Sequence, residues 1–172
     1  MTQPEAYMNE AAIKGAVLKE PHIRVTSLGI FRRGGQIFVQ ETYDPIKRET
    51  FYRPLGGGVE FGEQAADALI REMREETGLD VTNLRYAGMC ENIFTYLGQP
   101  GHEIVLLYEA DFADTTVYEH DEMNCQEDDG LPFRAVWKSI NEFGEDKDGP
   151  LYPNGLIELL KQSGLERTVW HQ

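Results

Sequence analysis

Three glutamates, Glu72, Glu75 and Glu76, lie close together near the middle of the chain. Carboxylates at such short spacing repel one another and resist burial unless a cation lies among them. Oxygen ligands suit Mg²⁺, which keeps part of its water shell and bridges to substrate phosphate oxygens. We therefore predict that the three side chains bind Mg²⁺, with Mn²⁺ able to substitute, at a site that handles phosphate.

A helix is expected to hold these carboxylates. Residues 63–77 contain no proline or glycine and are rich in Ala, Glu, Arg, Leu and Met, and Gly78 follows them, so we predict a helix over this range. Helical periodicity gathers the carboxylates in one stripe, with Glu76 almost in line with Leu69 at the buried edge. Negative charge is unfavourable in the last turn of a helix, which favours a bound cation. The alternative is an acidic face that contacts only solvent.

Residues 57–79 carry a fixed pattern of glycines, acids and one arginine. The matching positions are Gly57, Glu63, Arg71, Glu72, Arg74, Glu75, Glu76, Thr77 and Gly78, with apolar Met73 and Leu79. This pattern resembles a complete Nudix box. The resemblance implies an α/β (α+β) fold, an α/β/α sandwich with a mixed β-sheet and a catalytic loop-helix-loop. It also implies Mg²⁺-dependent hydrolysis of a pyrophosphate bond in a nucleoside diphosphate linked to another moiety, by metal-activated water.

The same resemblance assigns roles to individual residues. Metal ligation is expected from the carboxylates of Glu72, Glu75 and Glu76 and from the carbonyl of Gly56. Positioning of the motif is expected from Gly57 and from a hydrogen-bonded ion pair between Glu63 and Arg71. The general base that activates water is left open between Glu72, Glu76 and Glu127, the last on a distant acidic segment. One departure lies upstream, where the family often has Pro-Gly-Gly and this chain has Pro54-Leu55-Gly56-Gly57.

Substrate contacts are predicted around the glycine-rich segment. Arg53 could contact a terminal phosphate, and Phe61 and Tyr96 could stack on a nucleobase, although core or rim packing is the alternative for both aromatic residues. Other residues weighed for the site or its surroundings are Arg32, Arg33, Lys47, Arg48, Tyr52, Glu60, Phe94 and His102. Of these, the four basic residues are expected to be solvated, Glu60 to lie near the metals, and His102 to cap a turn.

The charge balance restricts the partners. The chain has 172 residues and a formal net charge of -14. This acid excess argues against long nucleic acids and anionic membranes, because both require a basic surface. Two cysteines are too few for a disulfide scaffold, and the sequence has no signal-like start and no long apolar run, so a cytoplasmic protein without an anchor is expected.

Strand patterns surround the predicted helix. Antiparallel strands at 22–32 and 36–42 are expected to flank a turn at 33–35, and a short strand at 50–53 is expected to stop at Pro54. Further strands are predicted at 81–96, 103–112 and 133–138, with a turn around 98–101, an acidic loop at 119–129, a helical turn at 140–143 and a helix at 154–162. We predict one domain over residues 21–172, preceded by an arm or short helix over residues 1–20.

Several functions fit this pattern. Within the enzyme class, the substrate could be a small nucleotide, ordinary or oxidised, an ADP-ribose-like nucleotide or a diadenosine polyphosphate, and Tyr96 is a weak pointer to the last. A module that binds nucleotide or protein without turnover is the main alternative, and a purely structural acidic helix is a third. A homodimer is left open.

Overall fold

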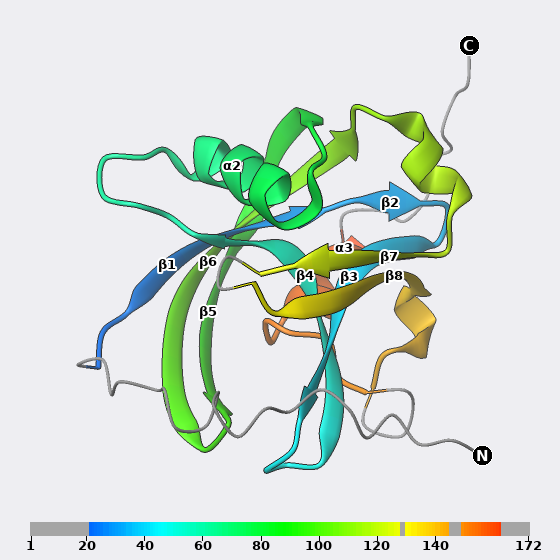
Figure 1. Cartoon of the computed structure of the whole chain (residues 1–172). Helices are drawn as coiled ribbons and strands as arrows, with labels where there is room; N and C mark the ends of the chain where they lie inside the picture. The colour runs from blue at the N-terminus through cyan, green and yellow to red at the C-terminus, as the bar shows by residue number, and fades with distance from the viewer. Residues whose placement is uncertain (1–20, 128–129, 145–148, 163–172) are drawn as a thin grey trace.

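The structure is a computed structural model that describes residues 21–127, 130–144 and 149–162 (Figure 1). The arm predicted over residues 1–20 lies outside the described residues. A single mixed sheet carries all the strands, in the order β5-β6-β1-β4-β3-β8-β7, with β2 paired to β3. The strands are β1 (Arg24–Ile30), β2 (Arg32–Arg33), β3 (Gln36–Asp44), β4 (Glu49–Gly58), β5 (Val81–Tyr96), β6 (Gln99–Phe112), β7 (Glu122–Gln126) and β8 (Pro132–Ser139).

Two α-helices cover opposite faces of this sheet. Leu69 and Met73 of α2 (Ala65–Thr77) pack with Phe31 and Phe112, whereas α3 (Leu156–Gln162) packs on the other side in a separate cluster of buried residues. Short 3₁₀ helices occupy Thr115–Glu119 and Ile140–Glu142. The predicted α/β/α sandwich with a mixed sheet is therefore confirmed, since β1 pairs in parallel with β6 and the other described strand pairs are antiparallel.

The predicted helix is confirmed with a shorter start. It begins at Ala65 rather than at residue 63 and ends at Thr77, and Gly78, whose φ is 72°, caps it by donating its N–H to the Arg74 carbonyl. The strand at 81–96 is observed with the predicted bounds. Within the described residues, no helix combines the length and the apolar character needed to cross a membrane.

The prediction that the strand at 50–53 stops at Pro54 was wrong. β4 runs on to Gly58 because it changes partner at this point. It pairs with β3 as far as Pro54, opposite Val39, and with β1 from Leu55 onwards, opposite Gly29. Pro54 therefore lies where the pairing with β3 ends and the pairing with β1 begins, and the glycines that follow it belong to the sheet.

Further differences from the sequence predictions concern strand pairing and one turn. Residues 122–126 form strand β7 rather than loop, because they pair with β8 and bury Cys125 against the α2 side. The β5–β6 turn is Leu97-Gly98, both with positive φ, and not residues 98–101. The strand predicted at 22–32 is divided: residues 24–30 form β1, which lies between β4 and β6, and Arg32 pairs with β3 in β2 together with Arg33 of the predicted turn.

Candidate functional site

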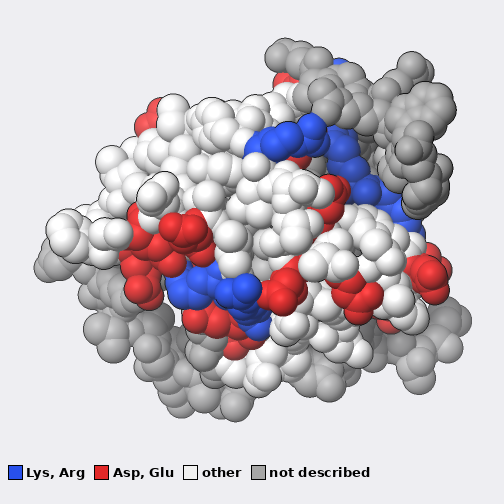
Figure 2. Space-filling model, turned by 90° about the horizontal axis from the view of Figure 1, so that it is seen from above, with Lys and Arg blue, Asp and Glu red and all other residues white. Residues whose placement is uncertain are grey.

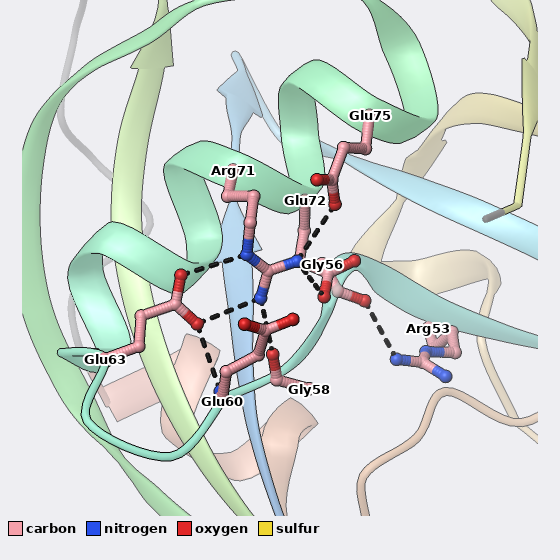
Figure 3. Close-up of polar contacts among 8 residues, drawn as sticks. All are labelled: Arg53, Gly56, Gly58, Glu60, Glu63, Arg71, Glu72 and Glu75. Atoms are coloured by element: carbon pink, nitrogen blue, oxygen red, sulfur yellow. Dashed lines mark hydrogen bonds and ion pairs between the residues drawn. The ribbon is translucent and has the colours of Figure 1, made fainter.

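Arg71 is the hub of the polar contacts beneath α2 (Figure 3). Its Nε and Nη2 atoms donate to the two carboxylate oxygens of Glu63, each at 2.9 Å, and Nη2 also donates to the Gly58 carbonyl at 2.9 Å. The Glu60 N–H adds a bond of 3.0 Å to Glu63. The predicted Glu63–Arg71 ion pair is thus present, and the bonds from Arg71 lower the pKa of Glu63. This pair ties the segment after β4 to the helix.

The same guanidinium holds two of the helix carboxylates. Arg71 Nη1 donates to Glu72 Oε1 and to Glu75 Oε2, each at 2.9 Å, and its acidic partners, Glu63 foremost, raise the pKa of the arginine. Glu72 is 5% exposed, whereas Glu75 is exposed. A Cβ placed on Gly57 would lie 2.4 Å from the carboxyl carbon of Glu72, so only glycine allows this approach.

Glu76 is the most perturbed carboxyl group of the site. It is 7% exposed, as its position beside Leu69 on the helix predicts. Burial, followed by the negative charges of Glu127 and Glu72, raises its pKa to about 8, although Arg53 and a hydrogen bond from the Gly56 backbone act in the opposite direction. An acid in this setting gains from any additional cation.

Arg53 and Gly56 lie on the same strand and contact each other. Arg53 Nη2 donates to the Gly56 carbonyl oxygen at 3.2 Å. This carbonyl oxygen is the one expected to ligate the metal. Gly56 has a φ of 123°, and a Cβ on it would lie 2.3 Å from the Ser27 carbonyl. The pairing of β4 with β1 therefore requires a glycine at position 56. The charge of Arg53, on the same strand, acts on Glu76.

The structure brings Glu127 to the helix carboxylates from the far edge of the sheet. It follows the last residue of β7, and its N–H donates to the Leu131 carbonyl at 2.8 Å, which closes the β7–β8 connection. Gln40 of β3 donates to Glu127 Oε1 at 2.6 Å. Charge interaction with Glu76 places this acid within electrostatic reach of α2.

A cavity is lined by residues of β3 and β4, of β1, and of β5 and β6. Its lining includes Arg53, Tyr96 and Glu127 among the predicted residues. Phe61 is fully exposed and does not line it, so the structure does not bring this predicted stacking residue to the cavity. Residues that sequence reasoning missed or treated as solvated are Gln40, Lys47, Phe51, Asn92, Glu103 and Tyr152.

A period-two signal could have found part of this lining. Asn92 and Phe94 alternate along β5 with residues of the opposite face, and Gln40 is a buried polar residue within an apolar strand. Phe94, also considered for stacking, does line the cavity. The remaining aromatic candidate, Tyr52, is a buried core residue whose hydroxyl donates to Glu41 at 3.2 Å.

The other considered residues have different surroundings. Arg32 and Arg33 pair with Glu109 and Asp121, and His102 Nε2 lies 2.9 Å from Glu91 Oε1. On the face that carries α2, acidic side chains lie beside basic ones in several places (Figure 2). Some of the acidic side chains are therefore paired within the protein.

The donor set suits a hard divalent cation. Within the described ranges, no three Asp, Glu, His or Cys side chains are already gathered around one metal position, because Arg71 engages Glu72 and Glu75. The acids around the buried Glu76 nevertheless offer oxygen atoms only. Burial first, and then the charges of Glu127 and Glu72, raise the pKa of Glu76 although Arg53 lowers it. These residues fit Mg²⁺ or Mn²⁺ provided that the side chains turn towards the ion.

Comparisons with known proteins point to one family. The NUDIX domain family matches residues 20–158. An NAD-capped RNA hydrolase NudC of Pseudomonas putida is 37% identical over 68 residues, which cover 40% of this chain and 24% of that protein. The oxidized purine nucleoside triphosphate hydrolase of Mus musculus is 36% identical over 85 residues, 48% of this chain and 53% of that protein. The alignments thus span about a quarter and about half of these relatives' lengths.

Solved structures show the same fold. The MutT NUDIX hydrolase from Burkholderia pseudomallei superimposes with a TM-score of 0.56 at 18% identity, covering 81% of this chain and 97% of that one. At this identity the likeness concerns the fold alone.

Proposed function

The chain belongs to the NUDIX family, and we propose on that premise that it is a divalent-metal-dependent pyrophosphohydrolase acting on a small nucleotide or nucleotide derivative. Its reaction is hydrolysis of a phosphoanhydride bond by water. The observation that carries the proposal is the buried carboxyl group of Glu76, with its pKa raised to about 8 among Glu72 and Glu127. Such a cluster is costly without a cation and is favourable around one.

Metal binding is assigned to Glu72, Glu75 and Glu76, with the Gly56 carbonyl as a further oxygen ligand. When bound, the ion supplies neutralisation of phosphate charge and acidification of a water molecule. The ion also offsets the local excess of negative charge, which otherwise opposes a phosphate group. Arg71 acts as the positioning residue, because it holds Glu63, Glu72 and Glu75 in one arrangement.

Three carboxylates are candidates for the base that takes a proton from water. Glu76 and Glu72 are buried, and Glu127 enters from the β7–β8 connection with its Oε1 bonded to Gln40. A raised pKa suits Glu76 to proton transfer near neutral pH. A metal ligand loses much of this basicity, so Glu127 is the base if Glu76 ligates metal.

The substrate phosphates are expected at the Arg53 end of the cavity. Arg53 donates to the Gly56 carbonyl, and its charge lowers the pKa of Glu76, so its guanidinium can bind phosphate oxygens next to the metal. Phe51 and Tyr96 meet edge to face with centroids 5.7 Å apart and provide an aromatic wall for a base. Lys47 on the cavity rim adds a second cation.

Nucleotide turnover is the direct test. The whole chain is incubated with nucleoside triphosphates, oxidised purine nucleotides, ADP-ribose, NAD and diadenosine polyphosphates, with Mg²⁺, with Mn²⁺ or with EDTA, and the products are separated by chromatography. We expect metal-dependent cleavage of at least one substrate and a loss of at least about 100-fold in Glu76→Gln. Asp67→Asn, an exposed acid on the same helix, is the matched control and should retain activity.

The main competing function is a nucleotide-sensing module. It predicts that nucleotide and Mg²⁺ raise the melting temperature while no product forms with any substrate. Such a result would overturn the enzymatic proposal, as would full activity of Glu76→Gln. A structural role for the acidic helix predicts that Mg²⁺ changes neither stability nor turnover.

A further inference from the structure

Asn92 and Glu103 form a buried polar pair at the end of the cavity that the proposed chemistry does not use. They are register partners on β5 and β6, and both line the cavity. Asn92 is 5% exposed and Glu103 is 6% exposed. The strand order separates them from Arg53 on β4 by β1, whose Leu28 lines the cavity between them. The cavity therefore has one end at Arg53 and Glu127 and a second, polar end at Asn92 and Glu103.

The amide of Asn92 is buried with an unused acceptor. Its Oδ1 atom is buried and has no hydrogen-bond partner in the described part of the chain. Buried polar atoms are satisfied in the great majority of cases, and exceptions need a reason. A ligand that donates a hydrogen bond to Asn92 Oδ1 at this end of the cavity would explain the unpaired acceptor.

Glu103 has acceptor capacity to spare. Arg24 Nη1 lies 3.5 Å from Glu103 Oε1, close enough for an ion pair but long for a hydrogen bond. An ionised carboxylate only accepts hydrogen bonds. With Asn92 as its register partner, Glu103 gives this end of the cavity two residues that can accept hydrogen bonds.

The apolar walls between the two ends suit a flat ring. Phe51 contacts Tyr96 and Tyr152 edge to face, with centroids 5.7 and 5.6 Å away, and Leu28 and Val105 lie on the sheet beneath the cavity. Nucleobases stack on such aromatic side chains, and this stacking depends little on which base is present. The acceptors of Asn92 and Glu103 then meet the edge of the base.

We propose that Asn92 and Glu103 select a guanine nucleotide by reading the N–H donors of its base edge. Guanine carries adjacent donors at N1 and at its 2-amino group, which two acceptor oxygens can receive together. Adenine instead directs the N1 lone pair at the carboxylate, which is repulsive. This inference rests on the proposed function and names its substrate class.

Nucleoside monophosphates test the inference without turnover, because they contain no phosphoanhydride bond. Binding of GMP, IMP and AMP to the whole chain with Mg²⁺ is measured by calorimetry. We expect GMP to bind at least about tenfold more tightly than AMP, in line with one bidentate contact, and IMP, which lacks the 2-amino group, to fall between them. Glu103→Gln should weaken GMP at least about tenfold and AMP little.

Two further variants separate recognition from structure. Asn92→Leu should weaken GMP binding without lowering the melting temperature, because Oδ1 has no partner to lose. Glu91→Gln is the matched control, since this neighbouring acid faces the opposite side of β5 and pairs with His102. It should leave all three affinities unchanged.

The outcomes distinguish this inference from the proposed function. Metal-dependent hydrolysis without a guanine preference would overturn the role of Asn92 and Glu103 and leave the proposed function standing. Guanine-selective binding without hydrolysis of any substrate would support the role of Asn92 and Glu103 and overturn the proposed function. AMP binding as tight as GMP, no binding of any monophosphate at millimolar concentration, or an unchanged GMP affinity in Glu103→Gln would each contradict the inference.

Discussion

The Cα of Gly57 on β4 faces the carboxylate of Glu72 on α2 so closely that an added Cβ would lie 2.4 Å from its carboxyl carbon. Gly57→Ala must therefore displace Glu72 or shift the helix. We expect the free energy of unfolding to fall by about 1–3 kcal/mol and Mg²⁺-dependent turnover to fall at least tenfold. Urea denaturation and turnover assays measure the two effects. Gly35→Ala, at a position with no atom near the new methyl group, should change neither.

Arg71→Lys should weaken the site although it preserves charge. Lysine cannot reproduce the two parallel bonds to Glu63 together with those to Glu72 and Glu75. We expect a loss of about 1–3 kcal/mol in unfolding free energy and a larger Mg²⁺ requirement for turnover. The matched control is Arg74→Lys, an exposed arginine of the same helix, which should stay within about 0.5 kcal/mol of the wild type. Equal effects in both variants would contradict the hub role of Arg71.

Asp44 should stabilise the mouth of the cavity in a pH-dependent manner. Its carboxylate accepts the N–H groups of Ile46, Lys47 and Leu97, at 2.8, 3.1 and 3.2 Å, and so joins the β3–β4 and β5–β6 turns. Burial alone would raise its pKa, but these backbone bonds outweigh burial and lower it from 3.8.

Because the folded-state pKa of Asp44 is the lower one, its stabilisation is complete above the unfolded pKa and is lost as the pH falls through the folded value. Asp44→Asn should lower the unfolding free energy at pH 7 by about 1–2 kcal/mol, and the difference should shrink in strong acid. Thermal unfolding at a series of pH values measures it. A difference that does not change with pH would contradict the assignment.

Glu76 should destabilise the metal-free protein at high pH. Its pKa rises from an ordinary value of 4.5 to about 8 in the folded chain, so the unfolding free energy falls as the pH rises between these values. In EDTA at pH 8 we expect Glu76→Gln to be more stable than the wild type by about 1–3 kcal/mol. Mg²⁺ should stabilise the wild type and have much less effect on the variant. Greater stability of the wild type in EDTA at pH 8 would refute this prediction.

The helix and its motif could be predicted from local sequence. The absence of breakers over residues 65–77, the glycine that ends the helix and the spacing of Glu72, Glu75 and Glu76 all act over a few residues, where helical geometry alone decides which side chains share a face. The Glu63–Arg71 pair was predicted from the resemblance and is observed. The exposure of Phe61 was not predictable, because an aromatic residue in a glycine-rich segment has no periodicity to follow.

Contacts between distant segments depended on strand order and register. Glu127 reaches Glu76 only because residues 122–126 form the edge strand β7, which the sequence pattern indicated as acidic loop. Asn92 faces Glu103 only because β5 and β6 pair in one register, and a shift by one residue would turn Asn92 to the opposite face. Short-range periodicity therefore specified the carboxylate stripe. The cavity, its polar end and its link to that stripe were decided by long-range pairing, whose free energy comes from burial across the whole sheet and not from any one segment.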